Sequence, residues 1–133
     1  MCAMRSSQSQ SFHDEVVRIA AERMDREKWK IYTNPDGQKN VGIGDQYPDI
    51  ILTPKNSNTV SIIVEVETED SVTLLEGQTQ WVQYSKMGGT FYLLVPKESV
   101  ERAKQICSQL SISPKFAAFS VSSGQLSITY NLA

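Results

Sequence analysis

Two short apolar segments, each carrying acids and separated by a polar turn, constrain this sequence more than any other feature. The first runs from Pro48 to Leu52 and has Asp49 at its start; the second runs from Ile62 to Glu67. The segment Asn56-Ser57-Asn58 between them is typical of a turn. The pattern therefore predicts an antiparallel hairpin with strands over residues 49–53 and 59–68.

The second predicted strand has one apolar face and one face that becomes acidic toward its end. Side chains alternate along a strand, so Glu65 and Glu67 point the same way. Pairing of the strands would bring Asp49 close to both. The apolar face consists of Val60, Ile62, Val64 and Val66, and the other of Ser61, Ile63, Glu65 and Glu67.

Three carboxylates this close raise one another's pKa unless a cation or protons neutralise them. The hairpin therefore predicts a divalent-metal site made by Asp49, Glu65 and Glu67. The alternative interpretation is an edge strand whose alternating charges protect it from aggregation.

Length and composition are those of one globular domain. The 133 residues are 40% hydrophobic and 21% charged. We expect a loose polar tail over residues 1–10 and a single domain over residues 11–133. The formal net charge of −2 argues against a protein that coats nucleic acid, but it allows an enzyme with local basic groups. No apolar run is long enough to span a membrane, and the polar tail lacks the apolar core of a signal peptide, so we expect a cytoplasmic protein.

The remaining periodicities predict an α/β fold in one domain. The first helix is expected over residues 12–28, with Ser11 as its N-cap, and it carries Glu15 at the margin of its apolar stripe. The single histidine, His13, cannot support a histidine-based metal cluster. Further strands are expected over residues 29–33, 91–95, 116–121 and 126–130, and further helices over 72–87 and 98–110.

The helix expected over residues 72–87 carries two neighbouring stripes. Glu76, Gln80 and Tyr84 recur every four residues and form the second of them. The first, which we expect to pack on the sheet, consists of Leu74, Leu75, Gln78, Trp81, Val82 and Ser85.

These elements resemble the restriction endonuclease-like fold of the PD-(D/E)XK nucleases, over roughly residues 12 to 95. The motif would be Pro48-Asp49 followed by Glu65-Val66-Glu67, on two consecutive strands. The resemblance implies a mixed central sheet flanked by helices, with an αβββαβ core followed by a C-terminal helix and strands. It also implies Mg²⁺ or Mn²⁺ held by Asp49, Glu65 and the carbonyl of Val66.

The same resemblance extends to three other positions. Gln80 and Tyr84 match the QxxxY element of RecB-like nucleases, and Glu15 matches an additional acid of many members. Glu67 stands where most members have a lysine, although some active restriction enzymes have a glutamate there. The implied function is a Mg²⁺-dependent nuclease that acts on DNA rather than RNA, as a homodimer or with a partner protein.

Two other functions fit the sequence. One is a catalytically inactive binding or assembly module on a nuclease fold, which the missing lysine, the sequence pI of about 5.4 and the lack of a DNA-reading domain favour. The other is a carboxylate-site hydrolase with a different substrate, which no sequence feature selects.

Overall fold

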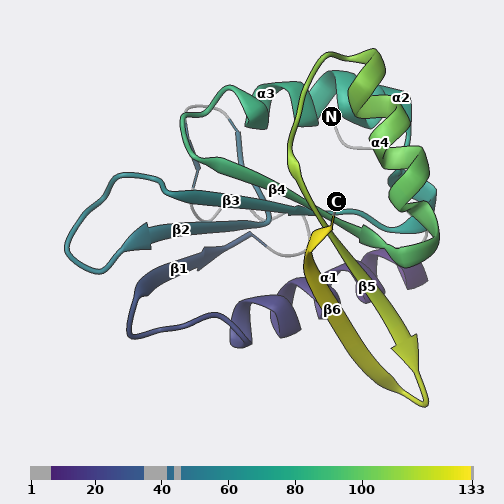
Figure 1. Cartoon of the computed structure of the whole chain (residues 1–133). Coiled ribbons are helices and arrows are strands. Elements are labelled where there is room, and N and C mark those ends of the chain that lie inside the picture. Colours follow the sequence, from purple (N-terminus) through teal and green to yellow (C-terminus); the bar gives the residue numbers. More distant parts are fainter. Residues whose placement is uncertain (1–6, 35–41, 44–45, 133) are drawn as a thin grey trace.

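Six strands form one curled, mixed sheet in the order β1-β2-β3-β4-β5-β6 (Figure 1). The structure is a computed structural model and describes residues 7–34, 42–43 and 46–132. β1 pairs with β2 and β2 with β3 in antiparallel fashion, β4 is parallel to both β3 and β5, and β6 returns antiparallel to β5. The strands are β1 (Trp29–Thr33), β2 (Ile50–Pro54), β3 (Ile62–Val66), β4 (Thr90–Pro96), β5 (Lys115–Ser122) and β6 (Gln125–Leu132). The predicted α/β class and the antiparallel hairpin of β2 and β3 are confirmed.

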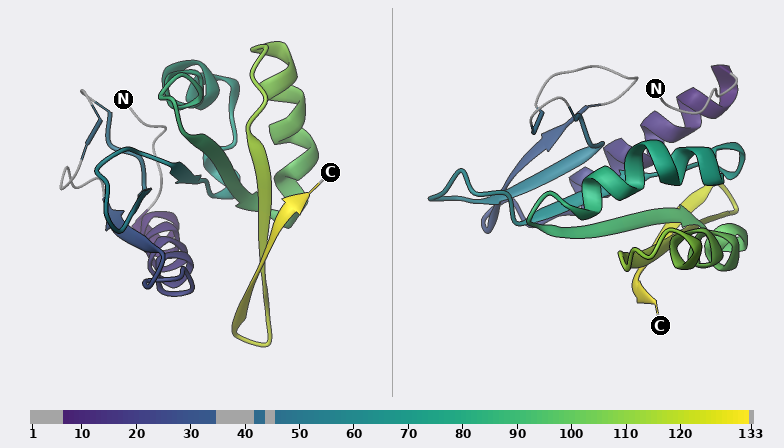
Figure 2. Two further views of the ribbon diagram at one scale, coloured as in Figure 1. Left: turned by 60° about the vertical axis from the view of Figure 1, so that its left-hand side comes forward. Right: turned by 90° about the horizontal axis from the view of Figure 1, so that it is seen from above.

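Helices cover both faces of this sheet (Figure 2). One face packs on α1 (Ser7–Glu22), and the other packs on the helices that follow β3 and β4. Those helices are the 3-10 turn η2 (Glu69–Ser71), then α2 (Leu74–Glu76), η3 (Gly77–Trp81) and α3 (Val82–Ser85), and finally the 3-10 turn η4 (Lys97–Ser99) with α4 (Val100–Gln109). None of the described helices combines the length and apolar character that a membrane crossing requires.

The alternation predicted for β3 is confirmed over Ile62–Val66, but Val60, which precedes the strand, packs on the opposite side from the one predicted, with the core under α3 and α4. Val64 and Val66 belong to the core on the α1 side, whereas Ile63 belongs to the core under α3 and α4. Each of these three side chains is at most 1% exposed, and burial of a valine or isoleucine contributes about 1.5–3 kcal/mol. These contacts fix which side of the sheet receives Glu65, because a slip of one residue would exchange the two faces.

The first helix begins and ends earlier than predicted. α1 begins at Ser7, so Ser11 lies inside the helix and is not its N-cap. Residues 7–10, predicted as part of the tail, are helical, and residues 1–6 and 133 lie outside the described part of the chain. The extension is held by tertiary contacts, since the Ser9 hydroxyl donates to Asp70 Oδ1 at 2.9 Å. After Glu22 the Asp25 side chain accepts from the backbone of Glu27, which competes with helix continuation.

The helical segment between β3 and β4 contains a π-helical turn, η3, between two α-helical pieces. A π turn adds a residue to the repeat and shifts the phase of the buried stripe. The prediction that Leu74 and Leu75 pack on the sheet is therefore wrong, since they are 42% and 60% exposed. Trp81 of the predicted stripe is buried, and the other buried residues of this segment are Glu76, Gly77 and Tyr84.

Close packing against α4 fixes the position of this π turn. A Cβ atom at Gly77 would lie 2.7 Å from Leu110 Cδ1 and 3.0 Å from Ile106 Cγ2, so a glycine allows the approach. The π turn therefore places Glu76 and Trp81 next to the end of β3 that carries Glu65 and Glu67.

Candidate metal centre

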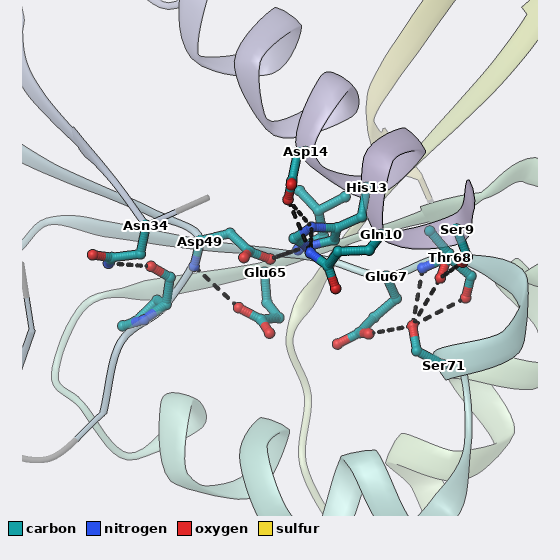
Figure 3. A network of polar contacts seen from close by, with 12 residues as sticks. Ser9, Gln10, His13, Asp14, Asn34, Asp49, Glu65, Glu67, Thr68 and Ser71 are labelled. Carbon is teal, nitrogen blue, oxygen red and sulfur yellow. Dashed lines mark hydrogen bonds and ion pairs between the residues drawn. The ribbon is translucent and has the colours of Figure 1, made fainter. Parts of the chain in front are cut away.

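Four acids gather where β2 begins and β3 ends. The antiparallel register pairs Ile50 with Val64, which places Asp49, just before β2, beside Glu65 on β3. The backbone N–H of Asp49 donates to Glu65 Oε1 at 3.1 Å (Figure 3). Glu67 follows β3, and Glu76 comes from α2. All four side chains are nearly removed from water, with exposures of 7% for Asp49, 5% for Glu65, 0% for Glu67 and 1% for Glu76.

Three of these acids form a compact oxygen site. One ligand atom each from Glu65, Glu67 and Glu76 lies within 4.8 Å of the other two. Carboxylate oxygens are the ligands that Mg²⁺ and Ca²⁺ prefer, and Mn²⁺ accepts them as well. This donor set fits a hard divalent cation, although nothing in it selects one metal.

The electrostatics of Glu65 show why a cation would be favourable here. Burial raises the pKa of the Glu65 carboxyl well above its ordinary value, and the neighbouring charges of Asp49 and Glu67 raise it further. The hydrogen bond from the Asp49 N–H acts in the opposite direction, and Glu76 adds a smaller upward contribution. A proton or a divalent cation relieves this repulsion.

Glu67, the last acid of the predicted motif, is anchored at both carboxylate oxygens. The Ser71 hydroxyl donates to Oε1 at 2.6 Å, and the Trp81 indole N–H donates to Oε2 at 2.9 Å. The backbone N–H of Glu67 donates to Leu94 O at 2.9 Å, so the main chain is fixed as well. This anchoring suits a residue that holds its position in a site better than one that exchanges protons with a substrate.

Asp49 faces α1 and not the three glutamates. Its Oδ2 accepts from the Val66 N–H at 2.8 Å and lies 3.0 Å from His13 Nε2. In Figure 3 the Asp49 carboxylate lies beside His13, whereas the side chains of Glu65 and Glu67 point away from α1. The predicted ligand set of Asp49, Glu65 and the Val66 carbonyl stays a prediction, and the Asp49 carboxylate of that set is engaged by the Val66 N–H and His13. Among the described residues, the group of three is completed by Glu76 and not by Asp49.

His13 is a site residue that the sequence analysis set aside. It is 3% exposed, and its Nδ1 lies 3.0 Å from Asp14 Oδ1 while its Nε2 faces Asp49. Gln10 completes the arrangement by donating to Asp14 Oδ1 at 3.0 Å. An imidazole can donate from both nitrogens only when it is protonated, and the two flanking carboxylates favour that form. The spacing of residues in the sequence could have identified His13 as buried. The buried residues of α1 are His13, Val16, Val17, Ala20 and Ala21, which follow the helical pattern i, i+3, i+4, i+7 and i+8.

Glu15 does not join the site. It lies on the exposed side of α1, where its carboxylate pairs with the Arg18 guanidinium at 2.6 and 3.0 Å. Hydrogen bonding from Arg18 lowers the pKa of Glu15. The expectation for Glu15 came from the resemblance to the nuclease family. The buried stripe of α1 includes His13 and not Phe12, which is 39% exposed, so the phase of the helix is one residue later than predicted.

Gln80 and Tyr84 have different surroundings. The end of the Gln80 amide that lies 2.5 Å from Glu76 Oε2 and 3.1 Å from Glu65 Oε2 is assigned as the nitrogen, the orientation in which it donates to both acids, so Gln80 belongs to the acidic group. Tyr84 is 2% exposed and belongs to the apolar core, where its ring meets Phe91 edge-on with the centroids 5.8 Å apart. Glu76 was not predicted as a site residue, although it stands four residues before Gln80 in the same stripe.

Comparison of the chain with protein-family models, with curated proteins and with solved structures finds no significant match. The candidate site therefore stands on its geometry alone.

Proposed function

We propose that this protein is a divalent-metal-dependent nuclease of the restriction endonuclease-like type, acting on DNA. The observation that carries the proposal is the convergence of Glu65, Glu67 and Glu76 at the end of β3. The order of elements supports it: a helix, three antiparallel strands, a helical segment and a strand parallel to the third. That order is the one expected from the motif Pro48-Asp49 and Glu65-Val66-Glu67.

In this proposal the protein holds the cation and orients the ligands. Glu65, Glu67 and Glu76 supply the carboxylate oxygens. A bound Mg²⁺ or Mn²⁺ supplies Lewis acidity to a phosphodiester and lowers the pKa of a coordinated water. Asp49 acts through the backbone, since its N–H orients Glu65 and its carboxylate holds the Val66 N–H.

The experiment is a cleavage assay on single- and double-stranded DNA with Mg²⁺ or Mn²⁺. We expect metal-dependent cleavage by the wild type and a loss of at least about 100-fold in Glu65→Gln, on the scale of losing an essential catalytic interaction. Glu101→Gln is the matched control, because Glu101 lies on the exposed surface of α4 with its side chain 85% exposed. Equal cleavage by wild type and Glu65→Gln would remove this site from the reaction.

A catalytically inactive binding or assembly module is the second candidate, and one observation favours it. Glu67 replaces the usual lysine and receives hydrogen bonds from Ser71 and Trp81 at both oxygens. Mn²⁺ stabilisation of the fold without cleavage of either DNA substrate would support this candidate over the nuclease.

A further inference from the structure

Gln80 lies between two of the three acids that would hold the cation. One terminal atom of its amide lies 2.5 Å from Glu76 Oε2 and 3.1 Å from Glu65 Oε2, and we assign this atom as the nitrogen because carboxylate oxygens face it. Each of these oxygens belongs to a carboxylate that is at least 95% buried, since Glu65 is 5% and Glu76 1% exposed. A donor at this point partly offsets the repulsion between the two acids.

We propose that Gln80 is a reversible ligand of the cation site. Without a cation its amide nitrogen bridges Glu65 and Glu76. With a cation bound between these acids, the amide turns over and presents its oxygen to the ion. The inference rests on the cation site of the proposed function and adds a fourth protein oxygen to it.

The chemistry of the amide permits this exchange. A glutamine amide carries two N–H donors at one end and a carbonyl acceptor at the other, and the two ends have nearly the same shape. The terminal torsion of a glutamine is broad, so a half-turn needs little rearrangement of the backbone. The carbonyl oxygen is also an accepted ligand for hard cations.

Trp81, the next residue along η3, shows the contrast. Its indole N–H donates to Glu67 Oε2 at 2.9 Å, and an indole nitrogen can only donate. The same π turn thus supplies one fixed donor, to Glu67, and one reversible group, to Glu65 and Glu76. Since Trp81 is fully buried and Gln80 is half-buried, Gln80 also has the greater freedom to turn.

The first test measures Mn²⁺ affinity by isothermal titration calorimetry, with no substrate present. We expect Gln80→Leu to weaken Mn²⁺ binding about tenfold, the lower end of what loss of a supporting metal contact costs. We expect Gln80→Glu, which keeps the shape and supplies oxygen at both ends, to bind Mn²⁺ more tightly than the wild type. Gln83→Leu is the matched control, because Gln83 is exposed on α3 and should leave the affinity unchanged.

The second test uses the wild type alone, so it stands even where a variant fails to fold. In a ¹⁵N-labelled sample we expect Mg²⁺ to shift the side-chain NH₂ resonances of Gln80 strongly and those of Gln83 little. Absence of Mn²⁺ binding by the wild type would overturn this inference together with the cation site. Mn²⁺ binding by the wild type with unchanged affinity in Gln80→Leu, or with unmoved Gln80 resonances, would overturn the role of Gln80 alone.

Discussion

Buried carboxylates lie on both sides of β3, but their hydrogen-bonding partners differ. On the α1 side, the Asp49 carboxylate lies beside an imidazole, with His13 Nε2 3.0 Å from its Oδ2. On the opposite side, Glu65, Glu67 and Glu76 face one another, and the donors described for them are neutral: a hydroxyl, an indole, an amide and a backbone N–H. Asp49 thus lies beside an ionisable ring, whereas the donors described above for the three glutamates carry no charge. A divalent cation beside Glu65 would relieve the repulsion that raises the pKa of its carboxyl.

We expect the largest change in stability when the contact between Asp49 and His13 is removed. Asp49→Asn removes the charge beside His13 Nε2, while the Asp14 carboxylate stays beside Nδ1. Because loss of one partner from a buried ion pair costs several kcal/mol, we expect the free energy of unfolding to fall by about 3 kcal/mol. Urea denaturation of wild type and variant at pH 7 measures this. A variant as stable as the wild type would show that His13 and Asp49 are not an ion pair.

An acid-to-amide substitution among the three glutamates should change the stability in the opposite direction. Glu65→Gln removes one of three mutually repelling charges while keeping the shape and an acceptor oxygen for the Asp49 N–H. Without metal we expect it to raise the free energy of unfolding by on the order of 1 kcal/mol, the equivalent of about one unit of pKa shift. A decrease in stability would mean that the wild-type carboxylate is better compensated than its surroundings indicate.

The pH dependence of the metal-free protein should show the same repulsion. The folded-state pKa of Glu65 lies above its ordinary value of 4.5, so between these two values the folded protein binds more protons than the unfolded chain. The contribution of Glu65 is therefore fully present below pH 4.5 and is lost as pH rises through the folded-state pKa. Between the two pKa values, the titration of Glu65 makes the free energy of unfolding fall by at most about 1.4 kcal/mol for each unit of rise in pH.

Thermal denaturation at a series of pH values compares this slope between wild type and Glu65→Gln. We expect the variant to lose part of the decline in stability with rising pH. Parallel curves for the two proteins would contradict the assignment of the slope to Glu65.

The smallest effect is expected at Glu15. Its carboxylate pairs with Arg18 in solvent, and such exposed pairs contribute little. Glu15→Gln should leave both the melting temperature and the Mn²⁺ affinity unchanged. A measurable loss of Mn²⁺ binding would show that Glu15 contributes to the metal site.

The sequence specified the strands of this fold more reliably than the phases of its helices. On β3 the side-chain period is two, so the apolar residues Val64 and Val66 fix the direction of Glu65 without reference to the rest of the chain. On a helix, one residue corresponds to about 100°, and a stripe that starts at Phe12 instead of His13 leaves out His13, Val17 and Ala21, which are buried.

The membership of the acidic group depended on contacts between distant parts of the chain. Glu76 reaches the end of β3 because a π turn and the close approach of Gly77 to α4 set the position of α2. The direction of the Asp49 side chain depends on the presence of His13, which is 36 residues away in the sequence. Neither contact has a local signature, and so the hairpin predicted an acidic site without predicting which acids share it.

The central claim is that Glu65, Glu67 and Glu76 hold a divalent cation, and Mn²⁺ titration calorimetry of the metal-free protein tests it most directly. We expect the wild type and Glu101→Gln to bind one Mn²⁺ ion per chain with the same affinity. Glu76→Gln, which changes an acid that lies outside the Asp49 and Glu65 motif, should bind at least about tenfold more weakly. Equal Mn²⁺ affinity in the wild type and Glu76→Gln, or no binding by the wild type, would contradict the account.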